Sequence, residues 1–172
     1  MLKDIILKRR TTRAYKEDKV DRELILDILK HSLMGPSYAN AHPVNFVLIE
    51  DKDSLKKLSE IEKFGTRYIA DVPCGVLVMA DTEITKVWVE ECSIVASYLG
   101  LLAQEAGLNT SWVDLKEGNT QKGVEIQTYL RDEFNIPENF KTLCFIPIGY
   151  GNERHKKRGD FDISDKVHIE KF

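Results

Sequence analysis

The spacing of apolar residues along this 172-residue chain alternates between the 3.6-residue period of amphipathic helices and short continuous runs. The helical spacing predicts five helices, and the short runs, bounded by turn-forming residues, predict four strands. Asp21 is a candidate N-cap for the second helix, which Gly35 and Pro36 should end. The expected helices contain Leu2 to Ile6, 21–33, 54–64, 87–106 and 123–134, and the expected strands are 44–50, 74–80, 109–115 and 142–150.

The longest periodic segment, 87–106, carries apolar residues almost all the way round, and Gly107 is its candidate C-cap. A helix of this composition must be buried on most sides. Its length of about 20 residues would also suit a membrane span. Glu90, Glu91 and Glu105 argue against a span, because charges in hydrocarbon are costly. We therefore expect a central helix of a globular protein, with no membrane partner and with a second subunit covering part of the helix.

The composition favours one globular domain over residues 1–172, because 42% of the residues are hydrophobic and 31% are charged. The formal net charge is −3, yet basic residues crowd into two short stretches, "KRRTTR" (8–13) and "RHKKR" (154–158). A nucleic-acid-binding protein would spread its basic residues over a face. Two compact basic stretches on an acidic body instead suit a small anion, so we expect no nucleic-acid partner.

Sequence motifs for several other chemistries are missing. The sequence has neither Gly-x-Gly-x-x-Gly after a strand nor Gly-x-x-x-x-Gly-Lys-Ser/Thr. The spacing of cysteines and histidines indicates no metal site, and no nucleophile can be paired with a base. Sparse cysteines and an N-terminal apolar run too short for a signal peptide favour a cytoplasmic protein with reduced thiols. The residues concerned are Cys74, Cys92, Cys144, His31, His42, His155 and His168.

Two segments each allow two interpretations. In "RRTTR" (9–13) the cations could simply lie at the end of the first helix, where the helix dipole favours each by roughly 0.3–1 kcal/mol. The threonines between the arginines would equally suit a phosphate or a polyhydroxyl chain. In "GPSYANAHP" (35–43) the loop could be a plain connection, or Ser37 and Asn40 could recognise the edge of a heteroaromatic ring. The residues alone leave both pairs of alternatives open.

The order of these pieces along the chain is the specific feature. "RRTTRAY" ends the first helix, "GPSYANAHPVNFVLIED" joins the second helix to a strand, "ECSIVASYLGLLAQEAGLNTSWV" joins the long helix to a strand, and "FIPIGYG" ends the last strand. In this order, over essentially the whole chain, the sequence resembles the nitroreductase family of FMN-dependent NAD(P)H oxidoreductases, and in particular a short, compact branch of it. The resemblance implies an α+β, nitroreductase-like fold. A mostly antiparallel central sheet would carry helices on both faces, with the long central helix at the interface of a homodimer.

The resemblance also implies the site. FMN would lie at the dimer interface, where one subunit holds the phosphate and ribityl chain and the other meets the flavin ring through residues 36–40. A backbone N–H within "WVDL" (112–115) would face flavin N5. No metal ligand and no catalytic side chain is implied, since the flavin carries the chemistry. The implied cofactor-binding residues are Arg9, Arg10, Thr11, Arg13, Pro36, Ser37, Tyr38, Asn40, Asp114, Leu115, Lys156 and Arg158.

The activity that the resemblance implies is a ping-pong transfer of hydride from NADH or NADPH to flavin N5 and then to a nitroaromatic, quinone or similar acceptor. The alternatives are a flavin-binding carrier or sensor without turnover, a flavin-fragmenting or reductive dehalogenating enzyme on the same fold, and an interaction protein without cofactor. The sequence departs from the family pattern at Thr11 and Tyr15, which keep the usual chemistry, and at Leu115, where many relatives have glycine. His42 and Val44 replace a glutamine and a tryptophan in the loop that shapes the pocket, so they bear on substrate preference.

Overall fold

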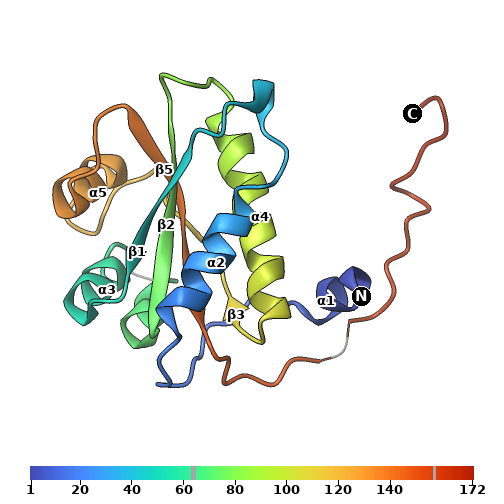
Figure 1. Cartoon of the computed structure of the whole chain (residues 1–172), viewed down its shortest axis with the longest axis horizontal. Coiled ribbons are helices and arrows are strands. Elements are labelled where there is room, and N and C mark those ends of the chain that lie inside the picture. Colours follow the sequence, from blue (N-terminus) through green and yellow to red (C-terminus); the bar gives the residue numbers. More distant parts are fainter. Residues whose placement is uncertain (63–64, 157) are drawn as a thin grey trace.

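One antiparallel sheet runs through the middle of the molecule and carries helices on both faces (Figure 1). This computed structural model describes residues 1–62, 65–156 and 158–172. The expected α+β fold is confirmed. The elements are α1 (Leu2–Lys8), α2 (Arg22–Ser32), the 3₁₀ turn η1 (Tyr38–Asn40), β1 (Val44–Ile49), α3 (Lys52–Ser59), the 3₁₀ turn η2 (Arg67–Asp71), β2 (Cys74–Asp81), α4 (Trp88–Glu105), β3 (Asn109–Thr110), β4 (Val113–Asp114), α5 (Ile126–Phe134) and β5 (Phe140–Gly149).

The sheet is built around β2 and β5, in the order β1-β2-β5-β3, and β4 also pairs with β5. Nearly all residues of β2 and β5 are buried, which explains why their sequences are continuous apolar runs rather than alternating ones. The single strand expected over 109–115 is instead two short strands. Thr110 pairs with Ile148 and Val113 pairs with Phe145. Pro147 lies between these pairings and has no N–H for a ladder hydrogen bond, so the strand is interrupted there.

Each face of the sheet has its own hydrophobic core. Figure 1 shows α2 and α4 on one side of the strands and α3 and α5 on the other. Full burial of one large apolar side chain contributes about 1.5–3 kcal/mol to the free energy of folding. The two cores together therefore stabilise the sheet that carries the loops at its edge. The first core includes Ile25, Leu29, Val76, Cys92 and Leu99, and the second includes Leu55, Leu58, Ile126, Leu130 and Phe145.

Carboxylates determine where three helices begin. Asp21, Asp51 and Glu125 each accept a backbone N–H from the first turn of α2, α3 or α5, at 2.8–3.0 Å. Asp21 confirms the expected cap of the second helix. The other two caps explain why α3 begins at residue 52 rather than 54, and why α5 begins at residue 126 rather than 123. α3 ends at residue 59, and the end of the expected helix, 63–64, lies outside the described residues.

α4 packs against both α2 and the sheet, as its apolar sequence predicted. Seven of its residues, from Glu91 to Ala103, are buried, whereas Tyr98 is 41% exposed. None of the helices described in the structure is long and apolar enough to cross a membrane.

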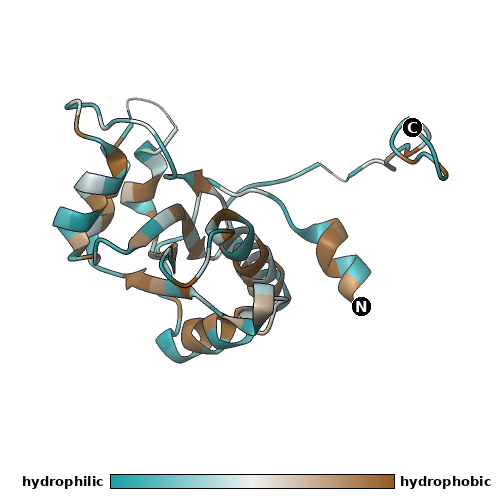
Figure 2. Cartoon of the chain, turned by 90° about the horizontal axis from the view of Figure 1, so that it is seen from above, coloured by the Kyte–Doolittle hydropathy of each residue, from teal (hydrophilic) through white to brown (hydrophobic). Residues whose placement is uncertain are grey.

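α1 and the C-terminal segment 158–172 project from the body on the same side (Figures 1 and 2). α1 forms where the sequence predicted it, yet none of its residues is buried. Its apolar side and that of the C-terminal segment are open to solvent within the described chain. The exposed large apolar residues here are Leu2, Ile6, Leu7, Phe161, Ile163, Val167, Ile169 and Phe172.

Segments 11–16 and 150–153, far apart in the sequence, run side by side at the edge of the sheet. Lys16 N–H donates to the carbonyl oxygen of Tyr150 at 2.8 Å, and Gly151 N–H donates to Asn109 Oδ1 at 3.0 Å. A Cβ atom at Gly151 would lie only 2.7 Å from that same Oδ1, so the close approach requires glycine. The end of the last strand thereby fixes the position of the chain that follows α1.

Candidate functional site

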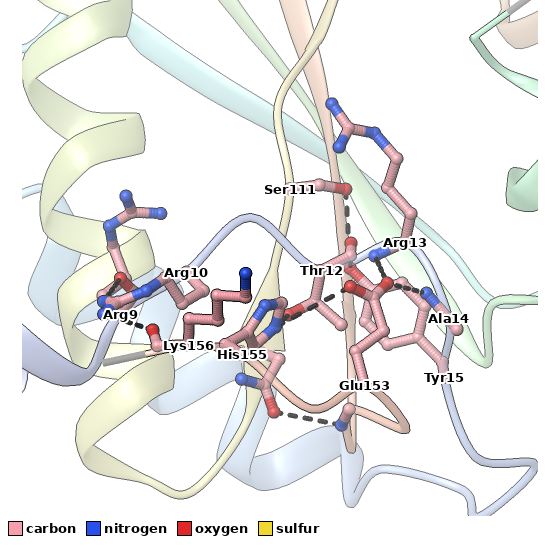
Figure 3. Close-up of polar contacts among 12 residues, drawn as sticks. Arg9, Arg10, Thr12, Arg13, Ala14, Tyr15, Ser111, Glu153, His155 and Lys156 are labelled. Atoms are coloured by element: carbon pink, nitrogen blue, oxygen red, sulfur yellow. Dashed lines mark hydrogen bonds and ion pairs between the residues drawn. The ribbon is translucent and has the colours of Figure 1, made fainter. Parts of the chain in front are cut away.

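The two basic stretches of the sequence meet in space where α1 ends (Figure 3). Arg158 Nη2 donates to the carbonyl oxygen of Arg9 at 3.2 Å, and Arg10 Nη2 donates to the carbonyl oxygen of Lys156 at 3.3 Å. The structure therefore brings together four of the residues that the resemblance implied, from opposite ends of the chain.

The guanidinium group of Arg10 donates hydrogen bonds to three backbone carbonyl oxygens. Its Nη1 donates to the carbonyl oxygens of Leu7 at 2.7 Å and Arg9 at 2.9 Å, in addition to the Nη2 bond to Lys156. A cation that binds the last carbonyls of a helix is favoured by the helix dipole. The helix-end interpretation of "RRTTR" therefore describes Arg10, whose guanidinium also ties the C-terminal segment to α1.

Arg9 is in a different electrostatic situation. Its partial burial, together with the positive charges of Arg158 and Arg10, lowers the pKa of the Arg9 guanidinium. Over residues 1–62, 65–156 and 158–172, no carboxylate forms an ion pair with any of these three arginines. Because like charges repel, the cluster is unfavourable until an anion binds beside it. Guanidinium groups bind phosphate particularly well.

An open hollow of ≈ 330 Å³ lies next to this cluster. Its walls combine a charged rim, hydroxyl groups and apolar surface, which together suit a ligand with an anionic end, a polar chain and a flat apolar ring. The small residues of α4 leave the space open. The hollow is lined by Arg9, Thr11, Ala96, Ser97, Gly100, Leu101, Thr110, Ser111, Trp112 and Ile146.

Adjacent threonines of "RRTTR" have different roles. Thr11, one of the cofactor-binding residues that the resemblance implied, is exposed and lines the hollow. Thr12 is fully buried, and its Oγ1 lies 3.3 Å from His155 Nε2. Glu153 accepts the backbone N–H groups of Arg13 and Ala14, the latter at 2.6 Å. These contacts hold the start of the C-terminal segment against the chain that follows α1.

Arg13 is not brought to the charged rim. Figure 3 shows its side chain apart from Arg9 and Arg10. It lines a separate hollow with Tyr15 and Lys52, among others. Of the three neighbouring arginines that the resemblance implied for the phosphate and ribityl chain, the charged rim contains Arg9 and Arg10 without Arg13.

The loop that contains Pro36, Ser37, Tyr38 and Asn40 lies at the other end of α4. Tyr38 N–H donates to the buried carboxylate of Glu91, in the first turn of α4. The hollow instead adjoins the helix at residues 96–101, about 7–15 Å further along the axis at about 1.5 Å per residue. One chain therefore does not bring the two halves of the expected site together.

Asp114 and Leu115 differ in which way their backbone N–H groups point. Leu115 N–H donates to the carbonyl oxygen of Leu143 at 3.0 Å, and its side chain is buried in the core beside α3 and α5. In an antiparallel ladder alternate N–H groups point to opposite sides, so the Asp114 N–H is directed away from β5. The Leu115 N–H is therefore already hydrogen-bonded within the sheet. Of the two residues, only Asp114 has a backbone N–H that could donate to a ligand.

Sequence reasoning missed the residues that shape the hollow. Ala96 and Gly100 lie one turn apart on α4, and small residues at this spacing signal space beside a helix. Ser111 and Trp112 lie in the gap between β3 and β4, which depends on a proline distant in the sequence. The spacing of the small residues on α4 could have been recognised in the sequence, whereas the break between β3 and β4 could not.

Comparisons with known proteins identify the family of the chain. The sequence model of the Nitroreductase family matches residues 6–72. A putative NADH dehydrogenase/NAD(P)H nitroreductase of Methanothermobacter thermautotrophicus is 31% identical over 98% of this chain and 86% of its own length. One with the same description from Archaeoglobus fulgidus is 28% identical, over 98% and 97% of the two chains. The solved structure of an FMN-dependent nitroreductase from Clostridium difficile R20291 matches with a TM-score of 0.92 and 34% identity, over 98% of both chains. The chain therefore belongs to the nitroreductase family.

Proposed function

We propose that this protein is an FMN-dependent oxidoreductase, which takes reducing equivalents from NADH or NADPH and passes them to a small acceptor such as a nitroaromatic or a quinone. The observation that carries the proposal is the meeting of Arg9 and Arg158 at the rim of a hollow that has both hydroxyl and apolar walls. The names of the relatives, two NAD(P)H nitroreductases and one FMN-dependent nitroreductase, support the same class of activity.

The residues around the hollow fit FMN. The guanidinium groups of Arg9 and Arg158 suit a phosphate, whose negative charge would offset both the burial and the repulsion between arginines that lower the pKa of Arg9. The Thr11 hydroxyl suits a ribityl oxygen, and Trp112 and Ile146 offer apolar surface to a ring. FMN, when bound, supplies the hydride chemistry that none of these side chains carries.

The chain contributes binding and electrostatics. Arg9, Arg10, Lys156 and Arg158 give the phosphate end a positive potential. We assign the N–H that faces the flavin ring nitrogen to Asp114, since its neighbour donates within the sheet. Because Arg13 lines a separate hollow, we do not place it at the phosphate.

We propose further that two copies of the chain complete each site. Pro36, Ser37, Tyr38 and Asn40 of a second copy would meet the ring, because within one chain this loop lies at the far end of α4. The exposed apolar residues of α1 and of segment 158–172 provide the surface that a second copy would cover. The half-exposed Trp112, next to the hollow, would be covered in the same interface.

A cytoplasmic location fits the cysteines. Cys74, Cys92 and Cys144 are all free and buried. Reduced thiols are typical of the cytoplasm, where disulfides rarely persist. We therefore propose that the reductase works there.

The test of the activity is steady-state oxidation of NADH and NADPH by the full-length protein reconstituted with FMN, with menadione as acceptor. The proposal predicts turnover that requires both FMN and menadione. Bound FMN that neither nucleotide reduces would contradict the proposal and would favour a flavin-binding carrier or sensor. A protein that binds no FMN after reconstitution would favour an interaction protein.

A further inference from the structure

Glu91 is the one buried carboxylate among the residues that the structure describes. It lies in the first turn of α4 and is only 3% exposed. Within the described chain, no cation forms an ion pair with it. Burial of a carboxyl group is costly unless a hydrogen-bond donor compensates it. Its neighbour Glu90 is exposed, so an acidic residue at the start of this helix does not have to be buried.

The donor that compensates Glu91 comes from loop 35–43, which joins α2 to β1 beside the start of α4 (Figure 1). Tyr38 N–H donates to Glu91 Oε1 at 2.5 Å. The direction of this hydrogen bond is certain, because a backbone N–H can only donate. The contact therefore satisfies the buried carboxyl group and at the same time ties the loop to the helix.

The loop has a conformation that it would not keep without support. Ala39, Asn40 and His42 have φ values of 50°, 56° and 46°. Residues with a Cβ atom rarely adopt this left-handed region, and alanine has no polar side chain that could compensate the strain. Such a conformation persists only where the surrounding contacts determine it.

Contacts at three points support the loop. At its start, a Cβ atom at Gly35 would lie 2.9 Å from Ile94 Cγ2, so the chain passes close to α4. Across the loop, His42 N–H donates to Ser37 Oγ at 2.9 Å. Between these points, Glu91 connects the part of the loop next to the left-handed residues to the body of the protein.

We propose that Glu91 is a positioning residue for the pocket over the flavin. By accepting the Tyr38 N–H, it holds loop 35–43 in the conformation that meets the ring. This inference rests on the proposed function, in which the loop of one copy faces the FMN bound by a second copy. Glu91 acts only through the loop, so it determines how well the acceptor binds and takes no part in the hydride transfer.

The first test is steady-state reduction of menadione by the full-length protein loaded with FMN. Glu91→Met fills a similar space without an acceptor oxygen. If the loop is then correctly placed for only about a tenth to a fifth of the time, the apparent affinity falls about 5- to 10-fold. The KM for menadione should rise by this factor, while kcat stays within about 2-fold.

Two further variants separate the hydrogen bond from the charge. Glu91→Gln keeps an acceptor oxygen, so its KM for menadione should stay within about 2-fold of the wild-type value. Glu90→Met is the matched control, because it removes the same charge from the same turn of α4 at an exposed position. Its KM should equal that of the wild type.

A second measurement follows the contact itself in the full-length protein, with or without FMN. Exchange of the Tyr38 N–H with solvent, measured by NMR, should be about 10-fold faster in Glu91→Met than in wild type or Glu91→Gln.

Tyr38→Pro removes the donor from the loop side, and the Ser37 backbone, at φ −132° and ψ 138°, already suits a residue before proline. Its KM for menadione should exceed that of Tyr38→Ala about 5- to 10-fold. This comparison tests the contact even if Glu91→Met does not fold.

A KM of Glu91→Met equal to that of wild type would overturn the inference and leave the proposed function intact. A KM of Glu91→Gln as high as that of Glu91→Met would also overturn it, because the acceptor oxygen would then not be the feature that matters. A wild-type protein without menadione-dependent turnover would overturn the proposed function. Exchange of the Tyr38 N–H would still decide whether Glu91 holds the loop.

Discussion

Arg158 donates a hydrogen bond to the carbonyl oxygen of Arg9 at 3.2 Å, across 149 positions of sequence. This contact gathers positive charge from both ends of the chain at one rim of the hollow. Such a cluster costs free energy unless an anion compensates it, because each guanidinium is charged at any physiological pH. The proposed phosphate of FMN would lie at this rim.

Removing both arginines should release FMN. The double variant Arg9→Ala, Arg158→Ala loses the charge-assisted hydrogen bonds to the phosphate, and we expect an affinity about 100-fold lower or weaker still. Equilibrium dialysis of the holoprotein after dilution measures the loss. Arg154→Ala is the matched control, because Arg154 is an exposed arginine of the same basic stretch that does not line the hollow. Full flavin occupancy in the double variant would rule out the phosphate assignment.

The proposed two-copy site can be tested by mixing defective subunits. One variant carries Arg9→Ala and Arg158→Ala, and the other carries Ser37→Ala and Asn40→Ala. Each alone should bind FMN poorly, but a mixed dimer would contain one intact site. After subunit exchange in mild denaturant, random pairing should restore about a quarter of the wild-type sites. No recovery in a mixture shown to contain mixed dimers would contradict the proposal that the loop acts on the other subunit.

Glu153 should hold the start of the C-terminal segment in place. Its carboxylate accepts two backbone N–H groups, and its side chain is 31% exposed, so Glu153→Ala should cost about 1 kcal/mol of local stability. Trypsin cleavage after Arg154 and Lys156 should become roughly five times faster, because local opening becomes more frequent. Glu117→Ala is the control, since Glu117 is 81% exposed and forms an ion pair with the neighbouring Lys116. Equal cleavage rates in the two variants would disprove this role of Glu153.

The buried thiols should make the protein sensitive to alkali. Burial raises the pKa of Cys74 and of Cys92 from 9.0 to about 12. A raised pKa in the folded state gives stability that is complete below pH 9 and is lost as the pH rises toward 12, since the unfolded chain then loses protons first. Each thiol should account for a decline of up to about 1.4 kcal/mol per pH unit.

Urea unfolding between pH 8 and pH 11 measures this decline, and Cys92→Ala should show a shallower one than wild type. In the native protein, a thiol reagent should label none of the three cysteines at pH 8, and should label all three after unfolding. Rapid labelling of the native protein would contradict the burial of these thiols.

Elements with a strong local pattern were predictable from the sequence. The helical spacing around Leu29 and Leu99 and the apolar runs of β2 and β5 placed these elements within a few residues, because their patterns follow from burial. The interruption of the strand at Ser111 depends on Pro147, which lies on another strand, so no local pattern could show it. Helix starts shifted where Asp51 and Glu125 act as caps.

The candidate site was predictable only in part, and mainly through the resemblance. The clustering of basic residues suggested an anion, but their meeting at Arg9 and Arg158 depends on tertiary structure. The separate position of Arg13 and the commitment of the Leu115 N–H depend on the packing of distant segments. The contact between Tyr38 and Glu91 joins residues 53 positions apart and had no signal in the sequence.

The most direct test is the visible absorption spectrum of the purified protein, recorded without oxygen before and after addition of NADH or NADPH. The proposed function predicts a flavin spectrum that bleaches when the nucleotide is added and returns when menadione follows. A protein that shows no flavin spectrum even after reconstitution with FMN, or a flavin that neither nucleotide bleaches, would contradict it.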